Sequence, residues 1–212
     1  ETFKVAQRLW DGERVDHDGT FEAHDAGLNY DAGEIPVYVG AQGPHMTRMA
    51  AKHADGALYN GAHPDDLAWA TEQVAKGKAD RPDERGEFDL AAYASVSIAE
   101  EETEAREAAR PPVAFIAGSA APPLLDRHDL DHDRASEIGD AISRGDFEAA
   151  FSTVTPAMID AFCIAGTPDA VEQKIEGVLE HADSFVAGSP LGPDLESAIE
   201  LLGAVFGRLD SA

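Results

Sequence analysis

The sequence predicts an α/β fold built on parallel strands, and three observations lead to this prediction. Residues Ile35 to Val39 (IPVYV) form a short apolar run, typical of a strand buried on both faces. Residues Ala57 to Asn60 (ALYN) form a second short strand pattern, and a helical pattern follows each run. A strand–helix–strand–helix order over so few residues implies parallel strands joined by right-handed crossovers.

The segment before the first of these strands predicts a helix and a small hairpin. Residues 1–10 carry Phe3, Ala6, Leu9 and Trp10 at helical spacing. Residues 11–21 alternate apolar and polar side chains between two glycines, which favours a hairpin or an extended excursion. Because the chain starts at Glu1 inside a helical pattern, we expect it to be a piece of a longer protein.

The helices after the two strands each show an apolar face. Residues 45–54 place Met46, Met49, Ala50 and His53 on one side, and a helix from Pro64 to about Lys76 places Leu67, Ala68 and Val74 inward. The elements expected further along are a strand at 90–99, a helix from 155, a strand at 162–165, a helix at 167–181, a strand at 184–187 and a last helix at 195–209. We predict a mostly helical insertion at about 100–154, where no strand pattern occurs.

The composition excludes several classes of protein. Forty-one Asp and Glu residues oppose sixteen Lys and Arg residues, which gives a formal net charge of −25. Such a chain repels nucleic acid and anionic membranes, so we expect neither as a partner. The acids are spread along the chain and 43% of the residues are apolar, which favours a globular fold with the acidic surface of a halophile. The lone Cys163 allows no internal disulfide, in keeping with a cytoplasmic protein.

The turn Gly40-Ala41-Gln42-Gly43-Pro44 is the first candidate site. It joins the Ile35–Val39 strand to a helix that begins near Pro44. Its glycines allow a ligand to approach the backbone closely, and the free amides and dipole of the helix start favour an anion such as phosphate. The alternative is a tight βα turn with no ligand, since the full dinucleotide fingerprint is absent. Both interpretations remain open on spacing alone.

Three other features of the sequence are candidates for a chemical role. The turn at residues 188–194 (GSPLGPD) also follows a strand, so in a barrel it lies on the same C-terminal face as the first turn. Residues 128–133 (HDLDHD) resemble a metal-binding pattern, but a solvated acidic face is the simpler interpretation, and we predict no metal site. Cys163 has an apolar context, which favours a small core residue over a nucleophile.

The chain resembles a known family of enzymes along nearly its whole length. Residues 35–60 (IPVYVGAQGPHMTRMAAKHADGALYN) resemble the strand–turn–helix of the luciferase-like flavin and deazaflavin oxidoreductases. The tail from residue 157, with AGTPD and GSPLGPD in that order, is similar to the coenzyme F420-dependent methylenetetrahydromethanopterin reductases. Residues 9–21 (LWDGERVDHDGTF) resemble the same reductases, and the likeness is weakest over residues 78–147.

The resemblance implies a (β/α)8 TIM barrel of the luciferase-like type with the helical insertion described above. On this basis residues 1–212 are a single partial barrel domain that lacks the N-terminal strands. It further implies a cytoplasmic, homo-oligomeric enzyme, and together with the acidic surface it leads us to expect a halophilic archaeon as the source. An open barrel exposes sheet edges, so we expect this segment alone not to be a stable active enzyme.

The resemblance also implies the chemistry, namely hydride transfer from reduced coenzyme F420 to the methylene carbon of a C1-pterin substrate. Cofactor contacts carried over to this chain are Gly40, Ala41, Gln42, Gly43, His45, Met46, Asn60 and His63. The family's catalytic acid lies on early barrel strands, so no catalytic residue is assigned here.

Other functions stay open at this point. A folate-type carrier could replace methanopterin, and FMN could replace F420. The protein could be an FMN-dependent monooxygenase, an F420-dependent alcohol or sugar-phosphate dehydrogenase, or a non-catalytic binding or scaffold segment.

Overall fold

A parallel sheet forms the centre of the molecule. The computed structural model describes residues 1–210. The strands are β3 (Tyr38–Ala41), β4 (Gly56–Asn60), β5 (Asp89–Ile98), β6 (Ile164–Gly166) and β7 (Ser184–Leu191). They are hydrogen-bonded in the order β3-β4-β5-β6, and β7 also pairs with β5. Every pairing in this sheet is parallel, which confirms the predicted α/β fold.

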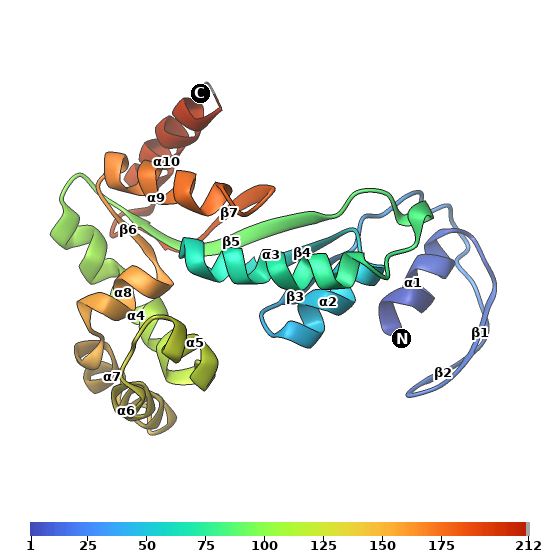
Figure 1. Cartoon of the computed structure of the whole chain (residues 1–212), viewed down its shortest axis with the longest axis horizontal. Helices are drawn as coiled ribbons and strands as arrows, with labels where there is room; N and C mark the ends of the chain where they lie inside the picture. The colour runs from blue at the N-terminus through green and yellow to red at the C-terminus, as the bar shows by residue number, and fades with distance from the viewer. Residues whose placement is uncertain (211–212) are drawn as a thin grey trace.

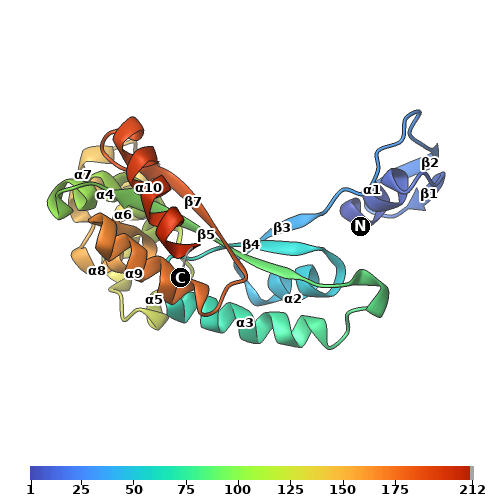
Figure 2. The same ribbon diagram turned by 90° about the horizontal axis from the view of Figure 1, so that it is seen from above.

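Helices cover one face of the sheet. They are α2 (Pro44–His53), α3 (Pro64–Lys78), α9 (Pro168–Leu179) and α10 (Leu195–Leu209). The core between helices and sheet contains Ala57 and Tyr59 of β4, Val96 of β5, Leu67 of α3 and Ile175 of α9. Figure 2 shows α2 and α3 on one side of β3 and β4. These helices therefore bury the sheet on this side.

The opposite face of the sheet is open among the residues that the structure describes. It presents Tyr38, Leu58, Tyr93 and Val186, which are 37–43% exposed. The prediction that Ile35–Val39 is a strand buried on both faces is therefore wrong. The strand begins only at Tyr38, within residues 1–210 it pairs only with β4, and one of its faces has no covering layer.

The N-terminal elements form a separate small unit. Helix α1 (Thr2–Trp10) precedes the antiparallel pair β1 (Val15–Asp18) and β2 (Glu22–Ala26), which confirms the predicted helix and hairpin. Figure 1 shows this unit at one end of the elongated molecule, with the sheet in the middle.

A bundle of helices lies at the other end, between β5 and β6. It consists of α4 (Glu102–Ser119), α5 (Pro122–Arg127), α6 (His132–Ser143), α7 (Phe147–Thr153) and α8 (Pro156–Phe162), and it has its own apolar core. We call α4–α8 the helical insertion. Residues 110–154 contain no strand, as expected. Helix α4 runs through Pro111 and Pro112, and buried residues such as Ala109 and Val113 hold it in place.

Several element boundaries differ from the sequence prediction. Phe162 ends α8, so β6 starts only at Ile164, and β7 continues beyond Ala187 to Leu191. Helix α2 buries Thr47, Ala50 and Ala51, whereas Met46, expected on the inner face, is 46% exposed. The small side chains allow α2 to lie close to the sheet, and this packing outweighs the apolarity of Met46.

Two aspartates each tie the start of a strand to the neighbouring strand in the same way. Asp55 precedes β4; its N–H donates to the Val37 carbonyl, and its carboxylate accepts from the Val37 N–H at 2.7 Å. Asp183 precedes β7 and makes the same pair of bonds with Leu90, with the N–H to carboxylate distance at 2.8 Å. Each aspartate ends a His-Ala-Asp tripeptide, at residues 53–55 and 181–183.

A short linker connects α3 to β5, the longest strand of the sheet. Between α3 and β5 a single 3-10 turn, η1 (Asp83–Arg85), connects the helix to the longest strand. The parallel order places the carboxyl ends of β3 and β4 at the same edge, next to the helical insertion. This edge is where the predicted site residues lie.

Candidate functional site

The turn between β3 and α2 brings five of the predicted site residues to the carboxyl edge of the sheet. Gly40 and Ala41 end β3, Gln42 and Gly43 form the turn, and His45 lies in the first turn of α2. The Gln42 side-chain amide donates to the Asn60 carbonyl at 3.4 Å, which links this turn to the end of β4. Gln42, Gly43 and His45 are exposed to solvent.

The two glycines of this turn have open space where a side chain would be. A Cβ atom added to Gly40 or Gly43 would meet no heavy atom within 4 Å. By contrast, a Cβ on Gly56 would lie 2.8 Å from the Asp89 carbonyl oxygen, and one on Gly188 would lie 3.0 Å from the Tyr93 ring. Close packing thus accounts for the absence of a side chain at Gly56 and Gly188. The space beside Gly40 and Gly43 is instead free for a ligand.

The start of α2 is also free of nearby acids. No acidic residue lies in its first turn, although the chain is strongly acidic, and Gly43 provides no capping side chain. Helix α3, by contrast, has Asp65 and Asp66 in its first turn. The unopposed dipole and free amide groups of α2 therefore favour an anion here more than at α3.

His63 lies at the start of α3, just after Asn60 of β4. Its Nδ1 atom accepts from the Asp65 N–H at 3.2 Å, so His63 caps the helix with its side chain. A neutral imidazole with Nδ1 occupied as an acceptor carries its proton on Nε2. His63 can therefore act as a hydrogen-bond donor through Nε2.

A cavity of about 170 Å³ lies between this edge and the helical insertion. Gln42 and Asn60 line it from the strand ends, and the insertion contributes Phe115, Ile116, Ser119, Ala120 and Leu124. These insertion residues were not among the contacts predicted from the sequence. They are far from the glycine turn along the chain, and their apolar pattern is that of any amphipathic helix, so no sequence signal identified them.

A buried ionic cluster lies beside this cavity. Asp66 of α3 has a side chain only 3% exposed; its Oδ1 is 2.5 Å from the Arg127 guanidinium and its Oδ2 is 3.0 Å from His128 Nε2. The Arg127 guanidinium also lies over the Trp69 ring, 4.7 Å from its centroid. We call Asp66, Arg127 and His128 the Asp66 cluster. Burial and the nearby Asp66 raise the pKa of Tyr59 to about 12.

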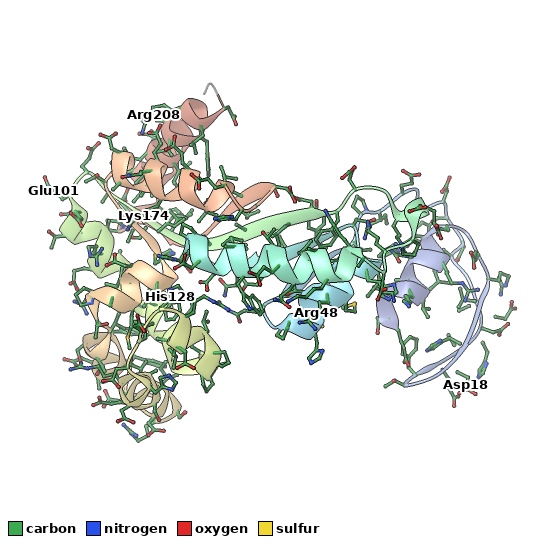
Figure 3. The ribbon with its side chains drawn as sticks, viewed as in Figure 1. Asp18, Arg48, Glu101, His128, Lys174 and Arg208 are labelled. Atoms are coloured by element: carbon green, nitrogen blue, oxygen red, sulfur yellow. The ribbon has the colours of Figure 1, made fainter. Side chains whose placement is uncertain are left out.

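The expectation of a solvated acidic face at residues 128–133 is wrong for His128, because its side chain is buried against Asp66. The ring also contacts His63 edge-on, with centroids 4.9 Å apart. His132, 47% exposed, instead pairs with Asp126 at 2.8 Å. Within residues 1–210 no group of His, Cys, Asp or Glu side chains is arranged to hold a metal ion. Figure 3 shows His128 in the insertion, far from Asp18 in the hairpin.

The second glycine turn is displaced along the sheet from the first. Gly40 is level with Ser184 across the sheet, whereas Gly188 is paired with Ser95, further along β5. A Cβ on Gly192 would lie 2.9 Å from that of Ala198, so this glycine allows close packing of α10. Cys163 is buried in the core as expected, and burial raises the pKa of its thiol to about 12.

Comparison with known proteins identifies the family. The family model described as luciferase-like monooxygenase matches residues 1–183. The chain belongs to the luciferase-like monooxygenase family. The resemblance noted from the sequence is thus confirmed, and the luciferase-like fold accounts for the parallel sheet with its helical insertion.

Individual relatives of this luciferase-like chain are reductases. The 5,10-methylenetetrahydromethanopterin reductases of Archaeoglobus fulgidus and Methanopyrus kandleri are each 39% identical to it and each align with 96% of the chain. The solved structure of the coenzyme F420-dependent tetrahydromethanopterin reductase from Methanopyrus kandleri matches 95% of the chain with a TM-score of 0.85 and 38% identity. The chain spans 60–63% of the length of these two curated relatives and 59% of that solved chain.

In the part of the chain that the structure describes, no helix is both long and apolar enough to cross a bilayer.

The eight predicted cofactor contacts lie on two neighbouring βα units of the sheet. They surround the turn between β3 and α2 and the connection between β4 and α3.

Proposed function

We propose that this chain is the cofactor-holding part of an F420-dependent oxidoreductase that reduces a methylene-tetrahydropterin C1 carrier. The observation that supports this most is the reductase likeness over nearly the whole chain, at 39–41% identity. An F420-dependent glucose-6-phosphate dehydrogenase of Beutenbergia cavernae is 36% identical over only 52% of the chain. The wider match favours the C1-pterin reductase.

The residues present fit a phosphate-bearing cofactor. Open space over Gly40 and Gly43 allows the cofactor to contact the backbone, and the acid-free start of α2 favours its negative charge. We propose Gly40, Ala41, Gln42, Gly43, His45, Met46, Asn60 and His63 as its contacts. When bound, the reduced cofactor supplies the hydride for the carrier's methylene carbon.

The chain's own residues bind and orient in this proposal. Gln42 is held by its hydrogen bond to the end of β4, so its side chain has a defined position for a ligand contact. His63 offers Nε2–H as a donor, and Phe115, Ile116 and Leu124 give the cavity an apolar wall. No catalytic acid is assigned among these residues.

The decisive experiment is a spectrophotometric assay of the full-length protein. Reduced F420 is offered in separate reactions with methylene-tetrahydromethanopterin and with methylene-tetrahydrofolate. Oxidised F420 is offered with glucose-6-phosphate, and FMN-dependent turnover is measured separately. We expect F420 oxidation with one of the two C1 carriers.

Other outcomes contradict the proposal in distinct ways. F420 reduction by glucose-6-phosphate would make the protein a sugar-phosphate dehydrogenase, and turnover only with FMN would place it among the flavin monooxygenases. Absence of F420 binding by the full-length protein would leave a scaffold role.

We also propose that the full-length enzyme is a cytoplasmic homo-oligomer from a halophile. The net charge of −25 and the free, buried Cys163 support a salt-rich, reducing environment. Sedimentation analysis of the full-length protein in high salt would test the oligomer, and a monomer at all salt concentrations would refute it.

A further inference from the structure

The Asp66 cluster connects the helical insertion to the strand ends that carry the candidate site. Asp66 lies three residues after His63, at the start of α3, whereas Arg127 and His128 come from the end of α5. Both carboxylate oxygens of Asp66 form hydrogen bonds: Oδ1 with Arg127 and Oδ2 with His128. These are interactions between residues 61 and 62 positions apart in the chain.

Asp66 of this cluster is also part of the wall of the candidate site. Asp66 lines a small void of about 10 Å³ together with Gln42, Asn60 and Leu124. Leu124 of α5 also lines the 170 Å³ cavity. The position of α5 therefore determines how far the insertion lies from Gln42 and Asn60.

We propose that the Asp66 cluster positions the insertion over the cofactor site, so that Asp66, Arg127 and His128 are positioning residues for ligand binding. The bonds are directional: Arg127 is held between the Asp66 carboxylate and the Trp69 ring, and His128 between Asp66 and the rings of His63 and Phe162. These directional interactions fix the distance of α5 from α3 and its rotation about its own axis. Apolar contacts alone would define both less well.

This inference rests on the proposed function, because its readout is F420 binding by the full-length protein. In Arg127→Met we expect the dissociation constant for F420 to rise about tenfold or more, since small displacements of positioning groups have large effects. The matched control is Arg106→Met. Arg106 is 22% exposed, close to the 18% of Arg127, but it pairs with Asp160 inside the insertion. We expect its effect on F420 binding to stay within about twofold, because distant sites act independently.

A second variant separates positioning from stability. Replacing Asp66 by Leu, Arg127 by Met and His128 by Leu together removes every member of the buried network, which often restores or raises stability. We expect this triple variant to unfold near the wild-type temperature and still to bind F420 about tenfold more weakly, because the directional bonds are gone. Affinity that recovers together with stability would overturn the inference.

A measurement on the wild-type protein needs no substitution. If the position of α5 affects F420 binding, then F420 must in turn stabilise that position, because coupling between sites is reciprocal. We expect F420 to slow amide hydrogen exchange in α5. Unchanged exchange in α5, or unchanged affinity in Arg127→Met, refutes the positioning role while the proposed function stands. No F420 binding by the wild type refutes both.

Discussion

At the scale of single residues, glycines that look alike in the sequence have different environments. Gly40 and Gly43 face open space, whereas a Cβ on Gly77 would lie 2.8 Å from the Ala51 side chain between α2 and α3. The first pair is therefore available to a ligand, and Gly77 permits two helices to pack closely.

A larger side chain at Gly40 should separate ligand binding from stability. Valine suits a strand, and Gly40 is exposed with no atom near its missing Cβ, so we expect Gly40→Val to unfold at the same or a higher temperature. We expect F420 affinity in the full-length protein to fall about tenfold, because the side chain fills the space for the ligand. Titration of F420 fluorescence and thermal unfolding measure the two effects.

The control for this variant is Gly203→Ala in α10, which also adds a methyl group into open space. We expect it to stabilise the helix slightly and to leave F420 affinity unchanged. Equal F420 affinity in Gly40→Val and wild type would contradict a cofactor site at this turn.

Cys163 should be chemically inert in the folded protein. Burial raises the pKa of its thiol from 9.0 to about 12, so the reactive thiolate is nearly absent at neutral pH. We expect a thiol reagent at pH 8 to react about a hundredfold faster after unfolding in urea. Because the folded pKa is raised, this group's contribution to stability is complete below pH 9 and is lost as the pH rises towards 12. Rapid labelling of native protein would contradict this.

The sequence predicted the glycine turn but not its surroundings. Strand, glycines and Pro44 are consecutive, so the local pattern was enough to place Gly40–Gly43 at a helix start. Asp66, Arg127 and His128 meet only through the tertiary fold, and His128 looked like one more residue of an acidic segment. Long-range ionic pairs leave no periodic signal in one sequence.

At the scale of elements, one arginine holds together the end of α2 and the linker before β5. Arg81 donates to the carbonyls of Ala51 and Ala54, at 2.9 and 2.6 Å, and to those of Arg85, Gly86 and Glu87. Ala51 and Ala54 lie at the C-terminal end of α2, where carbonyls lack partners in the helix. The Arg81 guanidinium thus donates to helix-end carbonyls that have no backbone N–H partner.

Replacing Arg81 by Lys should destabilise the protein although the charge is kept. A lysine cannot reach five carbonyls in one plane, so several stay without a donor, and we expect a loss of about 2 kcal/mol in the free energy of unfolding. Urea denaturation measures this loss. Arg8→Lys serves as control, because the Arg8–Glu13 pair is half exposed and should change stability by less than about 0.5 kcal/mol. Equal stability of both variants would contradict the role of Arg81.

Element types were predicted better than element limits. The order of helices and strands followed from periodicity, but α4 continues through Pro111 and Pro112, where local rules end a helix. The buried face of α4, from Ala105 to Ala117, stabilises the helix through packing that is absent from local sequence. Strand β3 begins only at Tyr38, whereas the apolar run that predicted it begins at Ile35.

At the scale of the whole molecule, the net charge of −25 should make stability depend on salt. Self-repulsion among carboxylates opposes the folded state, and the screening length falls to about 3 Å at 1 M salt. We expect the unfolding temperature to rise steeply with KCl up to about 1 M, where screening is nearly complete. Sucrose, an excluded but uncharged solute, is the control and should give a smaller rise. An unfolding temperature independent of KCl would contradict the interpretation of a halophilic surface.

Asp55 and Asp183, which make the same pair of bonds at two different strand starts, can guide the building of hybrid proteins. Each one ties the start of its own strand to a neighbour through two backbone-directed bonds that require no other side chain. A strand–helix unit exchanged with a relative at either residue therefore keeps its alignment if the aspartate is retained. We expect hybrids joined at these two positions to be soluble and folded more often than hybrids joined within α3 or α9.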